Sequence, residues 1–405
     1  MITVDQAIRT ILETVEPFNP ETVKLEEALG RVLSEPLVAD MDLPPFDRAR
    51  MDGYALRSED AKATPARLRV VGEIAAGAQP NITIGRGEAV KIFTGAPVPS
   101  DADAVQKIEV TEAQGGTVLI KEQVKPGQFI TRRASEVRNG EVVAEMGRLI
   151  GAAEMAVLAS FGYSKVRVGH RPQVAVISTG SELVRVSERP LSSQIRNSNS
   201  YTIASYARHS GAGVHIMDTV EDTVDATTKA LSEAAEKADL VITSGGVSMG
   251  DYDLVKAALI EIGAEIYFDK VSIRPGKPTV FARLGRTFFF GLPGNPVSTS
   301  VTFNVFVRPA IRKLQGDASP LLPMLGAELA ESTGDASNRR SYLPALLSVQ
   351  DGRAIVRSLK WAGSSDLVGF MNANALIVIP EEVHRIEKGD IVDVLSLWPA
   401  VAGSD

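Results

Sequence analysis

Short apolar runs alternate with helical segments through residues 170–315, and this pattern restricts the possible folds more than any other feature of the sequence. The runs read VAVIS, VHIM, LVITS, EIYF and TFFF, and helical segments begin near Ser198, Asp222, Asp251 and Val297. Strands and helices that alternate at this spacing predict a doubly wound, mainly parallel sheet with helices on both faces.

The segments on either side of this region differ in character. Residues 3–16 place apolar side chains at helical spacing, with Thr3 as the expected N-cap. Residues 66–130 and the chain after Gly316 show short alternating runs separated by turns. These runs predict a small β domain before the α/β region and a second β domain or barrel after it.

Composition excludes several classes of protein. A length of 405 residues predicts about two to four compact domains. Because cysteine is absent, disulfides, zinc–thiolate sites, iron–sulfur clusters and a cysteine nucleophile are excluded. A net charge of -7 argues against a nucleic-acid-binding surface. Any bound metal should be a hard cation on oxygen ligands, with magnesium the first candidate.

The chain shows no targeting or membrane signal. Its first residues lack the basic and apolar regions of a signal peptide, and no apolar stretch approaches the roughly 18 residues of a membrane span. We therefore expect a cytoplasmic protein without a membrane partner.

Three glycine-containing turns follow predicted strands, at residues 179–182, 245–253 and 291–296. Ligands of a doubly wound sheet bind outside the carboxyl ends of its strands, where backbone N–H groups suit an anion. Any α/β domain needs tight turns, but three in register favour an anion site.

Four carboxylates lie in or beside these turns: Glu182, Asp222, Asp251 and Asp253. Together with substrate phosphates, such oxygen ligands commonly hold magnesium. Helix capping is an equally available role for Asp222 and Asp251.

Three cations, Lys270, Arg274 and Lys277, surround a rigid Pro-Gly turn. This arrangement suits a phosphorylated or oxyanionic substrate with a bridging metal, although a solvated basic loop is the alternative. It is not a Walker A loop, because Pro278 stands where Ser or Thr is required.

A serine hydrolase is a remote alternative. Residues 246–250 match G-x-S-x-G between a predicted strand and a helix, with Ser248 in the nucleophile position. The necessary downstream histidine would be His384, which lies in the separate C-terminal β region.

Six motifs together resemble those of the molybdopterin molybdenumtransferase family, which comprises the bacterial MoeA enzymes and relatives such as the E domain of gephyrin. The resemblance covers essentially the whole chain. The motifs are PPFDRARMDGYALR (44–57), KIFTGAPVP (91–99), STGSEL (178–183), TSGGVSMGDYD (243–253), RPGKP (274–278) and GLPGNPVS (291–298).

This resemblance implies a multidomain α/β plus β fold with four parts. The implied limits are 1–20 with 169–316 for a doubly wound molybdopterin-binding domain, 21–44 with 136–168 for an elongated linking domain, 45–135 for a small inserted β domain, and 317–405 for a C-terminal β barrel.

The implied reaction is the magnesium-dependent insertion of molybdate into adenylylated molybdopterin, which releases AMP and yields the molybdenum cofactor. Family members are homodimers with the site between subunits. The implied partners are the molybdopterin adenylyltransferase and downstream cofactor-handling proteins, with no nucleic acid.

The resemblance assigns Glu182, Asp222 and Asp253 as functional acids and metal ligands, with Asp253 the strongest candidate. Asp52 and Thr94, in the first half of the chain, match residues that reach the site of the partner subunit.

It also assigns residues that contact substrates, some of them as open alternatives. They are Lys270, Arg274 and Lys277 as the basic stretch, Ser248 in its turn, Pro293 and Pro296 as a rigid turn, and Arg339 or Arg340 with Ser364 or Ser365 near molybdate.

The chain departs from the family pattern at three positions. Ala134 and Glu136 stand where the family usually has Gly and Asp, and Arg274 stands where Lys is frequent. Because Glu136 moves its carboxylate by one methylene, its role is open.

Three other functions also stay open. A molybdopterin adenylyltransferase would need only a domain like 170–315. Tungstate could replace molybdate, because the two oxyanions have nearly the same size and charge. A non-catalytic scaffold would be indicated by an exposed hydrophobic groove.

Overall fold

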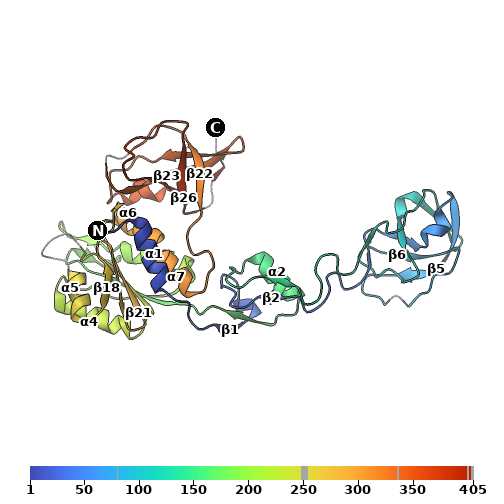
Figure 1. Cartoon of the computed structure of the whole chain (residues 1–405), viewed down its shortest axis with the longest axis horizontal. Coiled ribbons are helices and arrows are strands. Elements are labelled where there is room, and N and C mark those ends of the chain that lie inside the picture. Colours follow the sequence, from blue (N-terminus) through green and yellow to red (C-terminus); the bar gives the residue numbers. More distant parts are fainter. Residues whose placement is uncertain (80, 248–253, 335–336, 399–400, 403–405) are drawn as a thin grey trace. The chain divides into compact units, whose positions relative to one another are not determined.

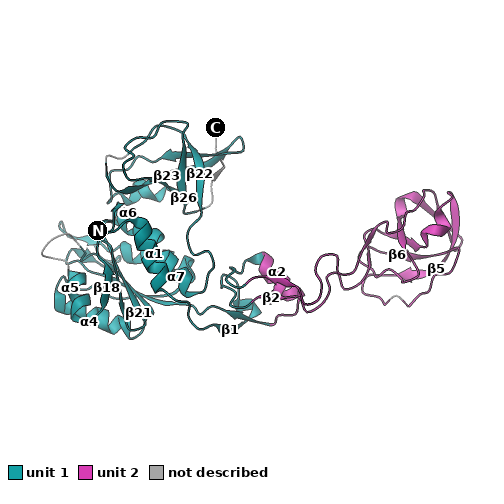
Figure 2. Ribbon diagram, in the orientation of Figure 1, with its two compact units in different colours: residues 1–35, 146–152, 165–405 teal, residues 36–145, 153–164 magenta. Residues whose placement is uncertain are grey.

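The computed structural model describes residues 1–79, 81–247, 254–334, 337–398 and 401–402. They form two compact units, one of residues 1–35, 146–152 and 165–405 and one of residues 36–145 and 153–164 (Figure 2). The first unit contains the α/β region and the C-terminal β region, and the second contains the small β region. Figure 1 labels the main elements of both units.

A six-stranded sheet forms the centre of the α/β region, in the order β16-β13-β17-β21-β20-β18. Strands β16, β13, β17 and β21 run parallel, and β20 and β18 add antiparallel pairings. The bounds are Gln173–Ser178 (β13), Gly213–Ile216 (β16), Leu240–Ser244 (β17), Glu265–Phe268 (β18), Val280–Leu284 (β20) and Thr287–Leu292 (β21). The predicted doubly wound, mainly parallel sheet is confirmed, whereas β20 is not predicted from the sequence.

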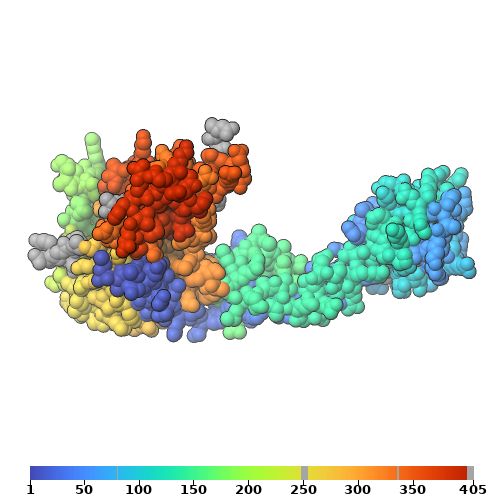
Figure 3. All heavy atoms as spheres, turned by 45° about the horizontal axis from the view of Figure 1, so that its top comes forward, coloured from blue at the N-terminus to red at the C-terminus, as the bar shows by residue number. Residues whose placement is uncertain are grey.

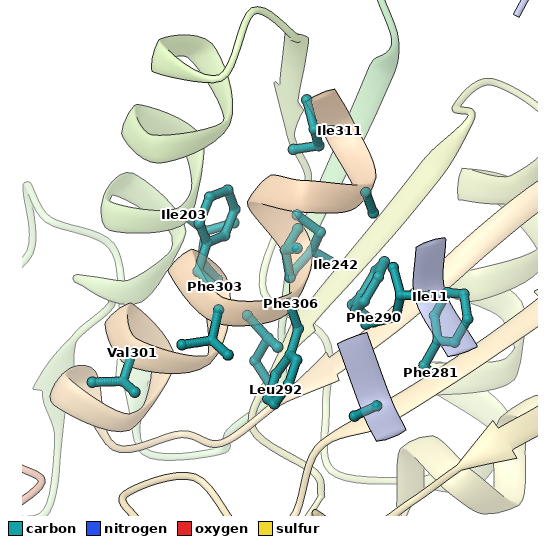
Figure 4. Packing of buried hydrophobic residues seen from close by; sticks show 14 of the residues in the cluster. Ile11, Ile203, Ile242, Phe281, Phe290, Leu292, Val301, Phe303, Phe306 and Ile311 are labelled. Carbon is teal, nitrogen blue, oxygen red and sulfur yellow. The ribbon is translucent and has the colours of Figure 1, made fainter. Parts of the chain in front are cut away.

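Helices cover both faces of this sheet, as predicted. One face packs against α1, α3, α6 and α7, and Figure 4 shows Ile11, Phe290, Phe303 and Phe306 in that core. The other face packs against α4 and α5. The bounds are Val4–Thr14 (α1), Asn199–His209 (α3), Val224–Ala235 (α4), Leu254–Glu261 (α5), Pro296–Thr302 (α6) and Arg308–Leu314 (α7), with a π-helical turn at Phe303–Val307.

The first helix begins as the sequence predicts. Thr3 Oγ1 accepts from Gln6 N at 3.2 Å and Thr3 N donates to Gln6 Oε1 at 2.9 Å, so both partners of a capping box are present. The helix ends at Thr14, because Val15 has an extended backbone with φ -86° and ψ 118°.

The C-terminal β region is a closed five-stranded barrel, as predicted. Its ring runs β23-β24-β22-β26-β25, and β25 pairs back to β23. The bounds are Met324–Leu329 (β22), Arg340–Gln350 (β23), Arg353–Ser358 (β24), Ala375–Ile379 (β25) and Ile391–Ser396 (β26). Strand β19 (Ile273–Arg274), from the α/β region, pairs with the start of β23 and joins the two parts. The short helix α8 (Leu367–Met371) and strand β27 (Val401–Ala402) complete this region.

The second unit holds a six-stranded sheet in the order β7-β4-β6-β5-β9-β8. The bounds are Gly53–Leu56 (β4), Ala66–Ile74 (β5), Glu88–Ile92 (β6), Ala104–Lys107 (β7), Thr111–Gln114 (β8) and Thr117–Ile120 (β9). This is the small β domain expected over 66–130.

Short antiparallel pairs join chain pieces that are far apart in sequence. They are β1 (Glu21–Lys24) with β12 (Lys165–Val168), β2 (Leu37–Val38) with β11 (Val142–Ala144), and β3 (Arg48–Ala49) with β10 (Ile130–Thr131). Helix α2 spans Ala152–Ser160, and Leu25–Glu27 forms one 3₁₀ turn.

Candidate functional site

Three strand-end turns of the α/β sheet meet at one edge. Thr179 N donates to Ser244 O at 3.1 Å, and Gly245 N donates to Leu292 O at 3.1 Å. The turns after β13, β17 and β21 are thus hydrogen-bonded in series, because adjacent parallel strands end at the same edge.

Glycine is required at position 245, where two of these turns touch. Gly245 has φ +92°, and a Cβ there would lie 2.5 Å from Thr179 O. A Cβ on Gly294 would lie 3.6 Å from the Cα of Gly245. The backbones of the turns therefore approach one another without intervening side chains.

A cavity of about 620 Å³, here called the turn cavity, lies over this edge. Its wall includes Thr179, Glu182, Asn199, Pro293 and Pro296. Thr179 Oγ1 and Asn199 Oδ1 are buried and have no hydrogen-bond partner within the part of the chain that the structure describes. Buried polar atoms are normally paired, so these two atoms indicate that something outside the described residues completes them.

A second cavity of about 720 Å³, here called the basic cavity, has three cationic side chains in its wall. Arg274, Lys277 and Arg339 line it together with the hydroxyls of Ser358 and Ser364. Guanidinium, ammonium and hydroxyl donors in one cavity suit an oxyanion.

The two cavities are neighbours. Pro278, Pro293 and Asn295 line both of them. Two small anionic groups could thus be held side by side, with these three residues between them.

The Pro-Gly turn of the basic cavity is held by close packing. Gly276 has φ +114°, and a Cβ there would lie 2.3 Å from Thr302 Cγ2. Thr279 Oγ1 donates to Gly276 O at 2.7 Å, and Val271 N donates to Lys277 O at 3.0 Å. These contacts fix the backbone that carries Arg274 and Lys277.

The structure separates two alternatives that the sequence leaves open. Arg339 lines the basic cavity, whereas Arg340 makes a bidentate pair with Asp5 at 2.6 and 2.8 Å. Ser364 lines the basic cavity and accepts from Asn295 Nδ2 at 3.0 Å, whereas Ser365 lines the turn cavity.

The predicted acids are placed differently from one another. Glu182 lines the turn cavity. The Asp222 carboxylate accepts from Ser181 N at 3.1 Å, so it holds the turn that carries Glu182. Asp253, like Asp251 and Ser248, lies outside the described residues.

Two further predictions concern a metal and Lys270. Across residues 1–79, 81–247, 254–334 and 337–398, no group of three or more His, Cys, Asp or Glu side chains could hold a metal ion. The predicted metal-binding triad of Glu182, Asp222 and Asp253 is therefore not found within these residues, which do not include Asp253. Lys270 is not in the wall of either cavity as described, and its carbonyl accepts from Ile2 N at 3.2 Å.

Asp52 and Thr94 lie together in the second unit. Thr94 donates to Asp52 Oδ1 from its backbone N–H and from its hydroxyl, both at 2.7 Å. These two donors lower the pKa of the Asp52 carboxyl below its ordinary value of 3.8, so it is ionised at neutral pH.

Two of the three departures from the family pattern, Ala134 and Glu136, also lie in the second unit. Ala134 has φ +58°, a left-handed conformation that favours glycine. The Glu136 carboxylate is 3.0 Å from Arg48 Nη2 and forms an ion pair with it.

Asn199 is a site residue that the sequence does not reveal. Its Nδ2 donates to Ser244 Oγ at 2.8 Å and to Gly294 O at 2.6 Å, so one amide joins two of the turns. Its place beside Ser198, at a predicted helix start, favours a capping role, and only the fold brings it to the sheet edge.

Three family models match consecutive parts of the chain. They are the MoeA N-terminal region (domain I and II) at residues 2–162, a probable molybdopterin binding domain at 175–313, and the MoeA C-terminal region (domain IV) at 326–397. A molybdopterin molybdenumtransferase of Staphylococcus epidermidis is 35% identical over 398 residues, which covers 97% of this chain and 95% of that protein. One of Staphylococcus aureus is 34% identical with the same coverage. The chain belongs to the molybdopterin molybdenumtransferase family.

Solved structures of the family agree with this assignment. A MoeA protein from Pyrococcus horikoshii is similar with a TM-score of 0.80 at 30% identity, over 98% of this chain and 100% of that chain. A second structure from that organism gives a TM-score of 0.84 at 28% identity with the same coverage. The predicted family, the multidomain fold and an enzyme of this kind are thereby confirmed. None of the described helices is long and apolar enough to cross a membrane.

Proposed function

We propose that this molybdopterin molybdenumtransferase family member inserts molybdate into adenylylated molybdopterin and releases AMP, with magnesium as the metal. The observation that carries the proposal is the contact between the two cavities through Pro278, Pro293 and Asn295. Insertion requires an oxyanion and a phosphorylated pterin to lie next to each other, and each cavity suits one of them.

Molybdate is assigned to the basic cavity. Arg274, Lys277 and Arg339 would offset the charge of the oxyanion, and Ser364 would donate a hydrogen bond to one oxygen. An arginine at position 274 adds a planar pair of donors, which can bind two oxygens of one ligand.

Adenylylated molybdopterin is assigned to the turn cavity. Backbone N–H groups of glycine-containing turns suit its phosphates, and Gly246 and Val247 line the cavity, whereas the N–H of Gly245 already donates to Leu292 O. Thr179 and Asn199 line this cavity, and their Oγ1 and Oδ1 atoms are buried without a partner within the described residues. Pro293 and Pro296 give that wall a rigid edge.

The residues fit magnesium in their chemistry, because Glu182 places a carboxylate in the turn cavity wall. We assign Glu182, Asp222 and Asp253 to its ligand set. When bound, magnesium would neutralise part of the phosphate charge and polarise the bond whose cleavage releases AMP.

Asp52 and Thr94 are assigned to the site of the partner subunit in a homodimer. The two hydrogen bonds that Thr94 donates to Asp52 keep the Asp52 carboxylate ionised and oriented. An ionised carboxylate could orient water or a cationic group at a site formed between subunits, and its lowered pKa makes it a weak proton acceptor. We further propose that the protein works in the cytoplasm with the adenylyltransferase that supplies its substrate.

One assay tests the proposal. The protein is incubated with adenylylated molybdopterin and magnesium, and AMP is measured with and without molybdate. We expect AMP only when molybdate is added, and a parallel arm with tungstate reports the choice of oxyanion. AMP release that does not depend on either oxyanion would indicate simple hydrolysis of adenylylated molybdopterin. Adenylylation of molybdopterin by the protein with ATP would favour the adenylyltransferase alternative.

A further inference from the structure

The first residues of the chain contact the strand that leads into the basic cavity. Ser272 N donates to Ile2 O at 2.7 Å, and Ile2 N donates to Lys270 O at 3.2 Å. Ile2 thus pairs in parallel with Val271, three residues before Arg274. A movement of the N-terminal segment would therefore be transmitted to the Pro-Gly turn.

The barrel contacts the same strand through other residues. Ile273 pairs with Arg340 and Arg274 pairs with Ser341, where β19 meets β23. In addition, Arg339 Nη1 donates to Ile273 O at 3.0 Å. The segment at residues 270–274 is therefore bonded both to the N-terminal segment and to the barrel.

A bidentate ion pair links the N-terminal segment directly to the barrel. The Arg340 guanidinium donates to both carboxylate oxygens of Asp5, at 2.6 and 2.8 Å, and Glu381 lies 3.5 Å from Arg340 Nε. The Arg340 side chain is only 22% exposed. Two parallel hydrogen bonds fix orientation as well as distance, which a single contact between exposed charges would not do.

Asp5 is itself held in place. It lies in the first turn of α1, and Val4, Ala7 and Ile11 of that helix are buried in the α/β core. Figure 3 shows the start of the chain, in dark blue, against the C-terminal domain in red. The backbone of Asp5 is thus fixed in the α/β region, and its side chain, which is 64% exposed, fastens the barrel through Arg340.

Arg339 and Arg340 are adjacent in the chain, but their side chains have different partners. Arg339 directly precedes β23 and lies in a bend, so its backbone follows that of Arg340, while its side chain donates to Ile273 O at 3.0 Å. Arg340 is bound to Asp5, and Arg339 lines the basic cavity. Loss of the ion pair would leave only the pairing of β19 with β23 and the Arg339–Ile273 hydrogen bond among these contacts, so Arg339 would be held less firmly beside Arg274.

We propose that Asp5 and Arg340 are positioning residues of the oxyanion site. Their ion pair fastens the barrel to α1 and so reinforces the β19–β23 contacts that set the spacing of Arg339 and Arg274 across the basic cavity. The inference rests on the proposed function for the identity of the oxyanion, which is molybdate. Neither residue touches the substrate.

The test measures molybdate binding to the full chain by calorimetry, without the pterin, in wild type and in Asp5→Asn. We expect the dissociation constant to rise by about threefold to tenfold, because small displacements of charged donors weaken a preorganised site. Asp5→Glu, which keeps the charge, should recover part of the affinity. Glu233→Gln removes one partner of an exposed ion pair in α4, with 4.0 Å between its charges, and should leave the affinity unchanged.

A kinetic readout separates positioning from a general loss of structure. In the AMP assay, Asp5→Asn and Arg340→Lys should raise the KM for molybdate, with the KM for adenylylated molybdopterin and kcat nearly unchanged. Unchanged molybdate affinity in both variants would overturn the inference, as would an equal rise of both KM values. If wild type binds molybdate but releases no AMP, the proposed function fails, and calorimetry still decides the positioning role.

Discussion

Ala134 has a backbone conformation that is unfavourable for a residue with a side chain. Its φ of +58° suits glycine, and its N–H donates to Pro44 O at 3.0 Å, so the turn has no freedom to relax. We predict that Ala134→Gly stabilises the second unit by about 0.5–1 kcal/mol, because the left-handed conformation is strained for any residue with a Cβ. Chemical denaturation measures the change.

A matched control for this prediction is Ala113→Gly. Ala113 is exposed and lies in strand β8, where glycine weakens the extended backbone, whereas Ala134 is half-buried. Its replacement should lower the free energy of unfolding. Equal destabilisation by both variants would contradict the account of Ala134.

The carboxyl of Asp52 provides a prediction about pH. Its lowered pKa means that its interactions stabilise the second unit above pH 3.8 and are lost as the pH falls through the lowered value. Thr94→Val removes the hydroxyl donor and keeps the backbone N–H, so the pKa of Asp52 should rise part of the way to 3.8. NMR titration of the carboxyl measures this change. Thr94→Ser keeps both donors and should leave the pKa low, whereas an unaltered pKa in Thr94→Val would refute the assignment.

For single residues, the sequence motifs predict much of the candidate site but not which of two adjacent residues lines a cavity. The motifs include Glu182, Arg274 and Lys277, which the fold gathers at two neighbouring cavities. They cannot separate Arg339 from Arg340, because two adjacent arginines have the same chemistry and only the fold sends them to different partners. Asn199 is missed because its bonds to Ser244 and Gly294 are long-range.

The Pro-Gly turn is the element on which the basic cavity depends most. We predict that Gly276→Ala destabilises the first unit by roughly 1–3 kcal/mol and weakens molybdate binding, because its φ of +114° is strained for alanine and its Cβ would meet Thr302 Cγ2 at 2.3 Å. Thermal unfolding and calorimetry measure the two effects.

A second substitution separates the two causes. Thr302→Ser removes the methyl group and keeps the hydroxyl that donates to Ser298 O at 2.8 Å. The double variant Gly276→Ala with Thr302→Ser should therefore recover the steric part of the loss. If it recovers nothing, the methyl contact is not responsible.

Helices and strands were predictable where the local pattern of apolar residues determines them. Strands β13, β17 and β21 lie inside the sheet with nearly all side chains buried, so they read as continuous apolar runs. Strand β20 includes the exposed Arg283 and directly follows the basic stretch, so its pattern is weaker. The pairing of β19 with the barrel joins residues far apart in sequence, and no local pattern encodes it.

At the scale of the molecule, the fold forms one cavity from two regions of the first unit. Arg274 and Lys277 come from the α/β region, and Arg339 and Ser364 come from the C-terminal region. The sequence predicts both domains, but their common cavity follows only from tertiary packing. The family resemblance supplies the expectation that the two meet at a substrate.

We predict that Asp253→Ala abolishes magnesium-dependent AMP release while the protein remains folded, because the proposed ligand set would lose a carboxylate. Glu182→Gln, in the wall of the turn cavity, should lower the rate in the same way. Asp225→Ala removes an exposed carboxylate from the first turn of α4 and serves as the control. Turnover of Asp253→Ala near the wild-type rate would reject the metal assignment.

The most direct measurement of the central claim compares the amount of AMP released with the amount of molybdenum inserted, in one reaction of the full chain with adenylylated molybdopterin, magnesium and molybdate. The account predicts equal amounts of both products and no AMP when molybdate is left out. AMP release at the same rate without molybdate, or molybdenum insertion without AMP, would contradict it.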